Sequence, residues 1–212
     1  MSARRSTGLS HPGRTLRRVM TADAEVPAEF LRALHALRDR RLRPEVHLTE
    51  IPAPGRIAPY AVALTADVRA PGIDDQEDDD QAASGRFVLL HDPAGQEAWE
   101  GTFRVVSLVR ASLDAETGAD PLLCEAAWTW VTEALGGAQD GYHALGGTVT
   151  RVVSQSFGSL AERPTDVEVE IRASWTPDGD VGAHLGAWST LLCTAAGLPP
   201  LPDGVSALSR RR

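Results

Sequence analysis

The chain has 212 residues, 42% of them hydrophobic, and a formal net charge of −8. This length suits one domain with a full hydrophobic core. All 21 basic residues are arginines, and neither lysine nor asparagine occurs, which excludes P-loop lysines, Schiff-base lysines and Cys-His-Asn triads. Between the basic ends of the chain, 13 arginines stand against 29 acidic residues. An acidic body of this kind repels phosphates and is a poor nucleic-acid platform.

The two ends of the chain are basic. Residues 1–24 are rich in Gly, Ser, Thr and Arg and show no hydrophobic periodicity, a composition typical of disorder. We therefore predict a disordered basic tail at 1–24, a single α+β domain at 25–207 and a basic C-terminal tail at 208–212. Such arginine-bearing ends are usually solvated, although they are the segments through which nucleic acid would be contacted.

The cysteines and the hydropathy pattern indicate the cellular compartment of the protein. Cys124 and Cys193 lie in separate apolar segments without the spacing of a metal site or a disulfide framework. The sequence contains no apolar run of about 18 residues and no hydrophobic region of a secretory signal. We therefore expect a cytoplasmic protein without a membrane span.

The first ordered element is predicted to be a helix that begins near Pro27 and ends before Pro44. Its apolar residues recur at helical spacing: Phe30, Leu31, Leu34 and Leu37. Two strands follow at 46–50 and 59–69, the second with alternating apolar and polar residues. Residues 74–80 contain six acids that repel one another, so we predict an acidic mobile loop at 70–84. The loop lacks the spaced ligands of a calcium-binding loop.

The remainder of the chain reads as one β-β-α unit written twice. The first copy comprises strands at 86–90 and 103–113 and a helix at 121–135. The second comprises strands at 148–157 and 167–175 and a helix at 181–196. The copies match best at 109–113 (VRASL) and 171–175 (IRASW). These few positions indicate a duplicated unit.

The strand at 167–175 predicts the fold class. Its odd-numbered residues are apolar, whereas Glu168, Glu170, Arg172 and Ser174 between them are polar. This alternation is typical of an antiparallel sheet with one buried face and one wet face. Helices must cover the apolar side, so we predict an α+β fold with helices packed on one face of an antiparallel sheet.

Tryptophan is over-represented, with five of the eleven aromatic residues. Core packing between helices and sheet is the simplest explanation. The alternative is an interaction surface, for which the candidates are Trp130, Trp128 and Trp188. Trp130 lies off the main apolar stripe of its helix and is the first to consider.

Arg110 and Arg172 occupy equivalent mid-strand positions on the polar face of the predicted sheet. Paired arginines on an open sheet can clamp a carboxylate or phosphate. The more ordinary alternative is a ladder of modest ion pairs with Glu168 and Glu170. These four residues are the candidate ligand-binding set.

No catalytic constellation, metal site or cofactor motif is evident, and we expect none. The six histidines lack metal-ligand spacing: His11, His35, His47, His91, His143 and His184. His91 precedes Asp92, but adjacent side chains on a strand point apart. The sequence contains no GxSxG elbow and no GxGxxG motif after a strand.

Several runs together resemble the actinobacterial domain-of-unknown-function family number 3000. They are RLRPEV (41–46), IPAP (51–54), ALTADV (63–68), GRFVLLHDP (85–93), WEGTFRVV (99–106), GGTVTR (146–151), EIRASWTP (170–177) and LCTAAGLPP (192–200). The resemblance extends over about residues 26–207, and the arginine-for-lysine, alanine-rich composition is typical of a high-GC actinobacterial sequence. The family implies no activity, cofactor or site residue.

Three functional hypotheses follow. The favoured one is a non-catalytic module that binds a partner protein or itself, in keeping with the tryptophan content and the acidic loop. The second is a small-molecule-binding protein, or an enzyme, that takes an anionic ligand at the polar sheet face around Arg110 and Arg172. The third is a nucleic-acid-associated accessory protein that would depend on the basic ends.

Overall fold

A computed structural model describes residues 26–69, 81–138 and 141–198. The tails expected at 1–24 and 208–212 and the acidic run at 74–80 lie outside the described residues. Within the part of the chain that is described, no helix combines the length and apolarity that a membrane crossing requires.

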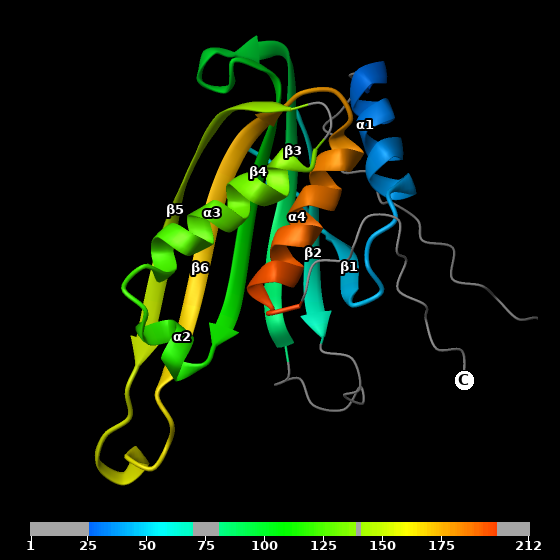
Figure 1. Ribbon diagram of the computed structural model, residues 1–212. Helices are drawn as coiled ribbons and strands as arrows, with labels where there is room; N and C mark the ends of the chain where they lie inside the picture. The colour runs from blue at the N-terminus through cyan, green and yellow to red at the C-terminus, as the bar shows by residue number, and fades with distance from the viewer. Residues whose placement is uncertain (1–25, 70–80, 139–140, 199–212) are drawn as a thin grey trace, which may run out of the picture.

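The fold is α+β, as the sequence predicts. The helices are α1 (Ala28–Asp39), α2 (Ala115–Ala119), α3 (Leu123–Gly136) and α4 (Val181–Ala195), with short 3-10 turns η1 (Glu97–Trp99) and η2 (Gly158–Leu160). The strands are β1 (Val46–Ile51), β2 (Tyr60–Arg69), β3 (Gln81–Gln96), β4 (Gly101–Leu113), β5 (Tyr142–Ser154) and β6 (Asp166–Pro177). They form one antiparallel sheet in the order β1-β2-β3-β4-β6-β5. Helices α1, α3 and α4 lie on the same face of this sheet (Figure 1).

The alternation along β6 has the predicted effect. Val169, Ile171 and Trp175 are buried beneath the helices, whereas Arg172 is exposed on the opposite face. The end of α4 also follows the sequence, because Gly197 adopts a positive φ of 72° and the Leu198 N–H donates to the Cys193 carbonyl at 2.9 Å. That pattern is a Schellman ending.

Several local predictions need correction, and one short helix is not predicted by the sequence. The strand predicted at 148–157 is β5, which runs from Tyr142 to Ser154. Residues 81–84 belong to β3 and pair with β2 and β4, so the predicted loop is too long at its C-terminal end. In α1 the buried residues are Phe30, Ala33 and Leu37, whereas Leu31 is 42% exposed, because the helix faces the sheet and α4 along a narrow stripe. The short helix α2 is capped by Asp114, whose carboxylate accepts from the Thr117 N–H at 2.8 Å. Its five residues are too few for a periodic signal.

The two β-β-α units exchange their helices. Helix α3 follows β4 in the chain but packs on β5 and β6, while α4 follows β6 and packs on β3 and β4. The main core lies between these helices and the sheet. A second, smaller cluster lies on the opposite face, where Trp99 of η1 packs on Val88 and Leu90. The face that carries this cluster, called the open face below, is covered by no α-helix among the described residues.

Candidate functional site

The open face carries two arginines in one row across the sheet. The strand registers place Arg86 of β3 beside Leu108 of β4, and Leu108 beside Arg172 of β6. Thr148 of β5 continues the row. Neighbouring strands lie about 4.8 Å apart, so the two arginines flank Leu108 at a backbone separation of roughly 10 Å. Among the residues that the structure describes, no carboxylate pairs with Arg86.

A hollow of about 470 Å³ lies over this row and the next one. The second row consists of Val88, Val106, Ser174 and Gly146 on successive strands. Val106 is 40% exposed, and no acidic side chain lines the hollow. The hollow therefore combines an apolar floor with two flanking guanidinium groups and the hydroxyls of Thr148 and Ser174.

Arg104 holds one end of the hollow in place. Its guanidinium donates to the Ser174 hydroxyl at 2.8 Å, to the Thr176 hydroxyl at 3.2 Å and to the Ala144 carbonyl at 2.8 Å. Burial lowers the pKa of this arginine from its ordinary value. Its three acceptors are neutral oxygens, and the nearby charge of Glu100 opposes the effect of burial on the pKa, so Arg104 adds a positive charge to the open face.

The predicted arginine and glutamate set forms a connected network beside the hollow. Arg110 lies 2.6 Å from one oxygen of Glu170, and Arg172 lies 2.6 Å from the other. Glu168 lies 3.7 Å from Arg110. Burial opposes ionisation of Glu170, but the hydrogen bonds from Arg110 and Arg172 outweigh it and lower the pKa of this carboxyl. The paired arginines thus clamp a carboxylate of the chain itself, as in the ladder alternative, and only Arg172 also lines the hollow.

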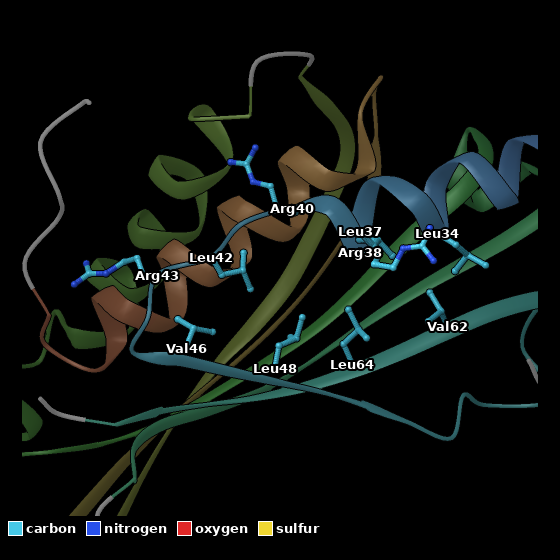
Figure 2. Close-up of a pocket in the computed structure, with 10 residues that line it drawn as sticks. All are labelled: Leu34, Leu37, Arg38, Arg40, Leu42, Arg43, Val46, Leu48, Val62 and Leu64. Carbon is cyan, nitrogen blue, oxygen red and sulfur yellow. The ribbon is translucent and has the colours of Figure 1, made fainter. Parts of the chain in front are cut away.

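A second cavity lies beneath α1 at the other end of the sheet, on the helix-covered face. It has a volume of about 240 Å³ and is lined by seven aliphatic and three arginine side chains: Leu34, Leu37, Leu42, Val46, Leu48, Val62, Leu64, Arg38, Arg40 and Arg43. Figure 2 shows the strand residues rising toward α1 and the segment that follows it. The sequence does not predict this cavity, because its lining comes from α1, the segment after α1 and two strands, and no motif marks these residues.

An aromatic stack anchors α1 to the sheet. The buried ring of His91 stacks on Phe103 with centroids 4.2 Å apart, and on Phe30 of α1 at 5.7 Å. Its Nδ1–H donates to the Thr102 carbonyl at 3.0 Å. Nε2 is buried without a hydrogen bond, 3.6 Å from the Glu29 carboxylate. The side chain of Asp92 accepts hydrogen bonds from Ala94 and Gln96, so it does not orient the ring.

One histidine and aspartate pair escaped the sequence analysis because 35 positions separate its members. His143 Nδ1 lies 3.0 Å from the Asp178 carboxylate, and its Nε2 lies 3.2 Å from the Glu100 carbonyl. Both ring nitrogens therefore face acceptors. An imidazole held on both sides in this way has no nitrogen left for a substrate, so the pair is a structural link between β5 and the end of β6.

The candidate tryptophans divide into two groups. Trp188 is 1% exposed, so it packs in the main core and presents no surface to a partner. It lies against Gly85 of β3, where an added Cβ would be 2.8 Å from the indole. Trp128 and Trp130 are half-buried, and Trp128 lies against Gly147 of β5 in the same manner. Trp130 retains exposed surface on α3.

The metal-binding residue types are dispersed. Within the described ranges, no group of three or more His, Cys, Asp or Glu side chains is close enough to hold a metal ion. Cys124 and Cys193 are both free.

Of the comparisons with known proteins, one identifies a relationship. No curated protein and no solved structure matches the chain significantly. A protein-family model described as "Protein of unknown function (DUF3000)" matches residues 26–206, which is nearly the whole chain. The protein therefore belongs to the DUF3000 family of proteins of unknown function.

Proposed function

We propose that this protein is a non-catalytic binding protein that holds a small anionic ligand with a flat apolar body in the hollow on the open face. The observation that carries this proposal is the row formed by Arg86, Leu108 and Arg172. Two guanidinium groups that flank one aliphatic side chain can converge on a single carboxylate, sulfonate or phosphate above it. The apolar floor supplies the remaining affinity by removing ligand surface from water.

The chain itself provides a precedent for this mode of binding. Glu170 occupies with its carboxylate the space between Arg110 and Arg172, at 2.6 Å from each. On the other side of Arg172, the space above Leu108 holds no carboxylate of the described chain. An external anion in that space would lie between Arg172 and Arg86, as the carboxylate of Glu170 lies between Arg110 and Arg172.

The test uses 1-naphthoate, a flat aromatic carboxylate, titrated into the full-length protein by calorimetry. We expect Arg86→Gln and Arg172→Gln each to weaken binding about tenfold, since a charge-assisted hydrogen bond contributes about 1.5–3 kcal/mol. Arg163→Gln, an exposed arginine in the β5–β6 connection, is the matched control and should bind like wild type. Equal affinities of all three variants, or no binding by the wild type, would contradict the proposal.

A second candidate function is self-association through β5, in keeping with the protein-binding hypothesis. Strand β5 is an edge of the sheet, and its Val152 and Val153 are 46% and 55% exposed. An exposed edge with apolar side chains is a template for pairing with another strand, and two copies of β5 can pair antiparallel about a two-fold axis.

Sedimentation velocity over a range of concentrations tests this candidate. Val153→Lys should shift the protein toward the monomer, whereas Ser112→Lys, on an exposed position of interior strand β4, should not. In the same experiment, Trp130→Ala tests whether the exposed surface of Trp130 on α3 takes part in self-association. A wild-type protein that stays monomeric at all concentrations would contradict self-association.

The remaining sequence hypotheses stay predictions. Binding to nucleic acid would depend on the basic ends, which lie outside the described residues. The cytoplasmic location and the actinobacterial origin are likewise expectations from the sequence.

A further inference from the structure

The cavity beneath α1 is lined by seven aliphatic side chains and three arginines. Its floor is formed by Val46 and Leu48 of β1 and by two residues of β2, and its roof by residues of α1 and by Leu42 (Figure 2). Its volume of about 240 Å³ is below the roughly 300–1,000 Å³ of sites that take drug-sized ligands. The space therefore suits a small ligand with an apolar body, such as a short aliphatic chain.

The polar side chains that line this cavity are all arginines. Arg43 is held by Glu45, with nitrogen to oxygen distances of 2.9 and 3.3 Å. Arg40 has no carboxylate partner among the described residues, and its guanidinium lies over Gly186 of α4, where a Cβ would clash with it. Arg38 is 52% exposed and lies 3.8 Å from the adjacent Asp39, beyond hydrogen-bond distance.

The arrangement of the arginines distinguishes them further. In Figure 2 the side chain of Arg38 lies beside that of Leu34, whereas Arg40 and Arg43 point away from the two strands. Arg38 is therefore the arginine best placed to meet a charged group at the end of a chain that occupies the cavity. In a protein with a net charge of −8, a rim that consists of arginines alone selects for an anion.

We propose that this cavity is a binding site for a short aliphatic carboxylate. The alkyl chain lies between α1 and the β1–β2 strands, where it is removed from water, and the carboxylate accepts hydrogen bonds from Arg38 at the rim. This site lies on the helix-covered face of the sheet, away from the hollow that contains Arg86 and Arg172, and it does not depend on the function proposed for that hollow.

The experiment is a titration of the full-length protein with sodium octanoate, followed by methyl NMR spectra and calorimetry. We expect the methyl resonances of Leu34, Leu48 and Val62 to shift, and octanoate to bind more tightly than butyrate because burial increases with chain length. Octanol should bind about tenfold more weakly than octanoate, since it lacks the charge that Arg38 recognises.

Matched variants assign the site. Arg38→Gln should weaken octanoate binding about tenfold, whereas Arg32→Gln, an exposed arginine on the same helix that does not line the cavity, should leave it unchanged. Shifts confined to the open face, affinity lost in Arg172→Gln and kept in Arg38→Gln, or equal affinity for octanoate and butyrate would each overturn the proposal. If Arg38→Gln does not fold, the location of the methyl shifts in the wild type decides the question. Failure here leaves the naphthoate experiment unaffected, because that experiment depends on a different pair of arginines.

Discussion

Val109 of β4 and Ile171 of β6 pair directly with each other at the centre of the sheet. They are also the first residues of the two matching segments, 109–113 and 171–175. A residue that pairs with its own counterpart lies on a two-fold axis, and the neighbouring pairs Leu108–Arg172 and Arg110–Glu170 are exchanged by that axis. The register therefore supports the duplicated unit that the sequence indicates.

The tryptophan and glycine contacts follow the same symmetry and can be tested. We expect Gly85→Ala to destabilise the protein by about 1–3 kcal/mol, because a Cβ there would lie 2.6 Å from the Leu108 carbonyl oxygen and 2.8 Å from Trp188. Gly147→Ala should behave similarly, since its Cβ would meet the Arg172 carbonyl and Trp128. The free energy of unfolding in urea is the measurement. Gly136→Ala is the matched control in α3, where nothing lies within 4 Å, and it should stabilise by up to about 1 kcal/mol.

The carboxyl of Glu170 makes stability depend on pH. Its folded pKa is below the ordinary value of 4.5, so its contribution is fully present above that value and is lost as the pH falls through the folded pKa. We expect Glu170→Gln to cost about 1 kcal/mol at pH 7, because Arg110 and Arg172 are half-exposed or more. Urea unfolding at a series of pH values should show the two proteins converging in stability below pH 4.5. A difference that stays constant with pH would contradict this account, and Glu125→Gln on the exposed side of α3 is the control.

The ring of His91 is expected to contribute strongly to stability. It fills the space between Phe30 and Phe103 and is fully buried. His91→Ala leaves a cavity and removes the hydrogen bond to the Thr102 carbonyl, so we expect a loss of about 2–4 kcal/mol. His35→Ala, an exposed position on α1, should change stability by less than about 0.5 kcal/mol. Thermal unfolding of the two variants makes the comparison, and similar melting temperatures would show that the stack does not anchor α1.

The two thiols should react at very different rates. Burial raises the pKa of Cys193 and outweighs the opposing effect of Arg43, whereas Cys124 is half-buried on α3. Since the thiolate is the reactive form, iodoacetamide should modify Cys124 first in the native protein. Peptide mass spectrometry over time gives both rates. Modification of Cys193 at the rate of Cys124 would show that α4 opens readily.

The sequence predicts which face of the sheet a side chain occupies better than it predicts which side chains lie next to it. The period of two along 167–175 identifies which side chains of β6 are wet, and Glu170 with Arg110 and Arg172 therefore appears as a candidate ladder. Arg86 was missed because it stands in a short apolar strand, and only the register through Leu108 brings it beside Arg172. The burial of Trp188 agrees with core packing, the simplest explanation that the sequence offers for the tryptophans. Helix α4 is covered by the sheet, α1 and α3 together, and that environment is set by tertiary packing.

The exchange of α3 and α4 between the two β-β-α units has a consequence for folding. Each pair of strands buries its apolar face under the helix of the other unit. In a fragment that contains only one unit, the apolar face of the strands would therefore be exposed to water, and the helix would lack the strands on which it packs. Neither half can then form a stable nucleus by itself, and the contacts that complete the core join distant parts of the chain. Such a chain is expected to unfold in a single cooperative transition and to fold slowly, since the long-range contacts must form before the core is closed.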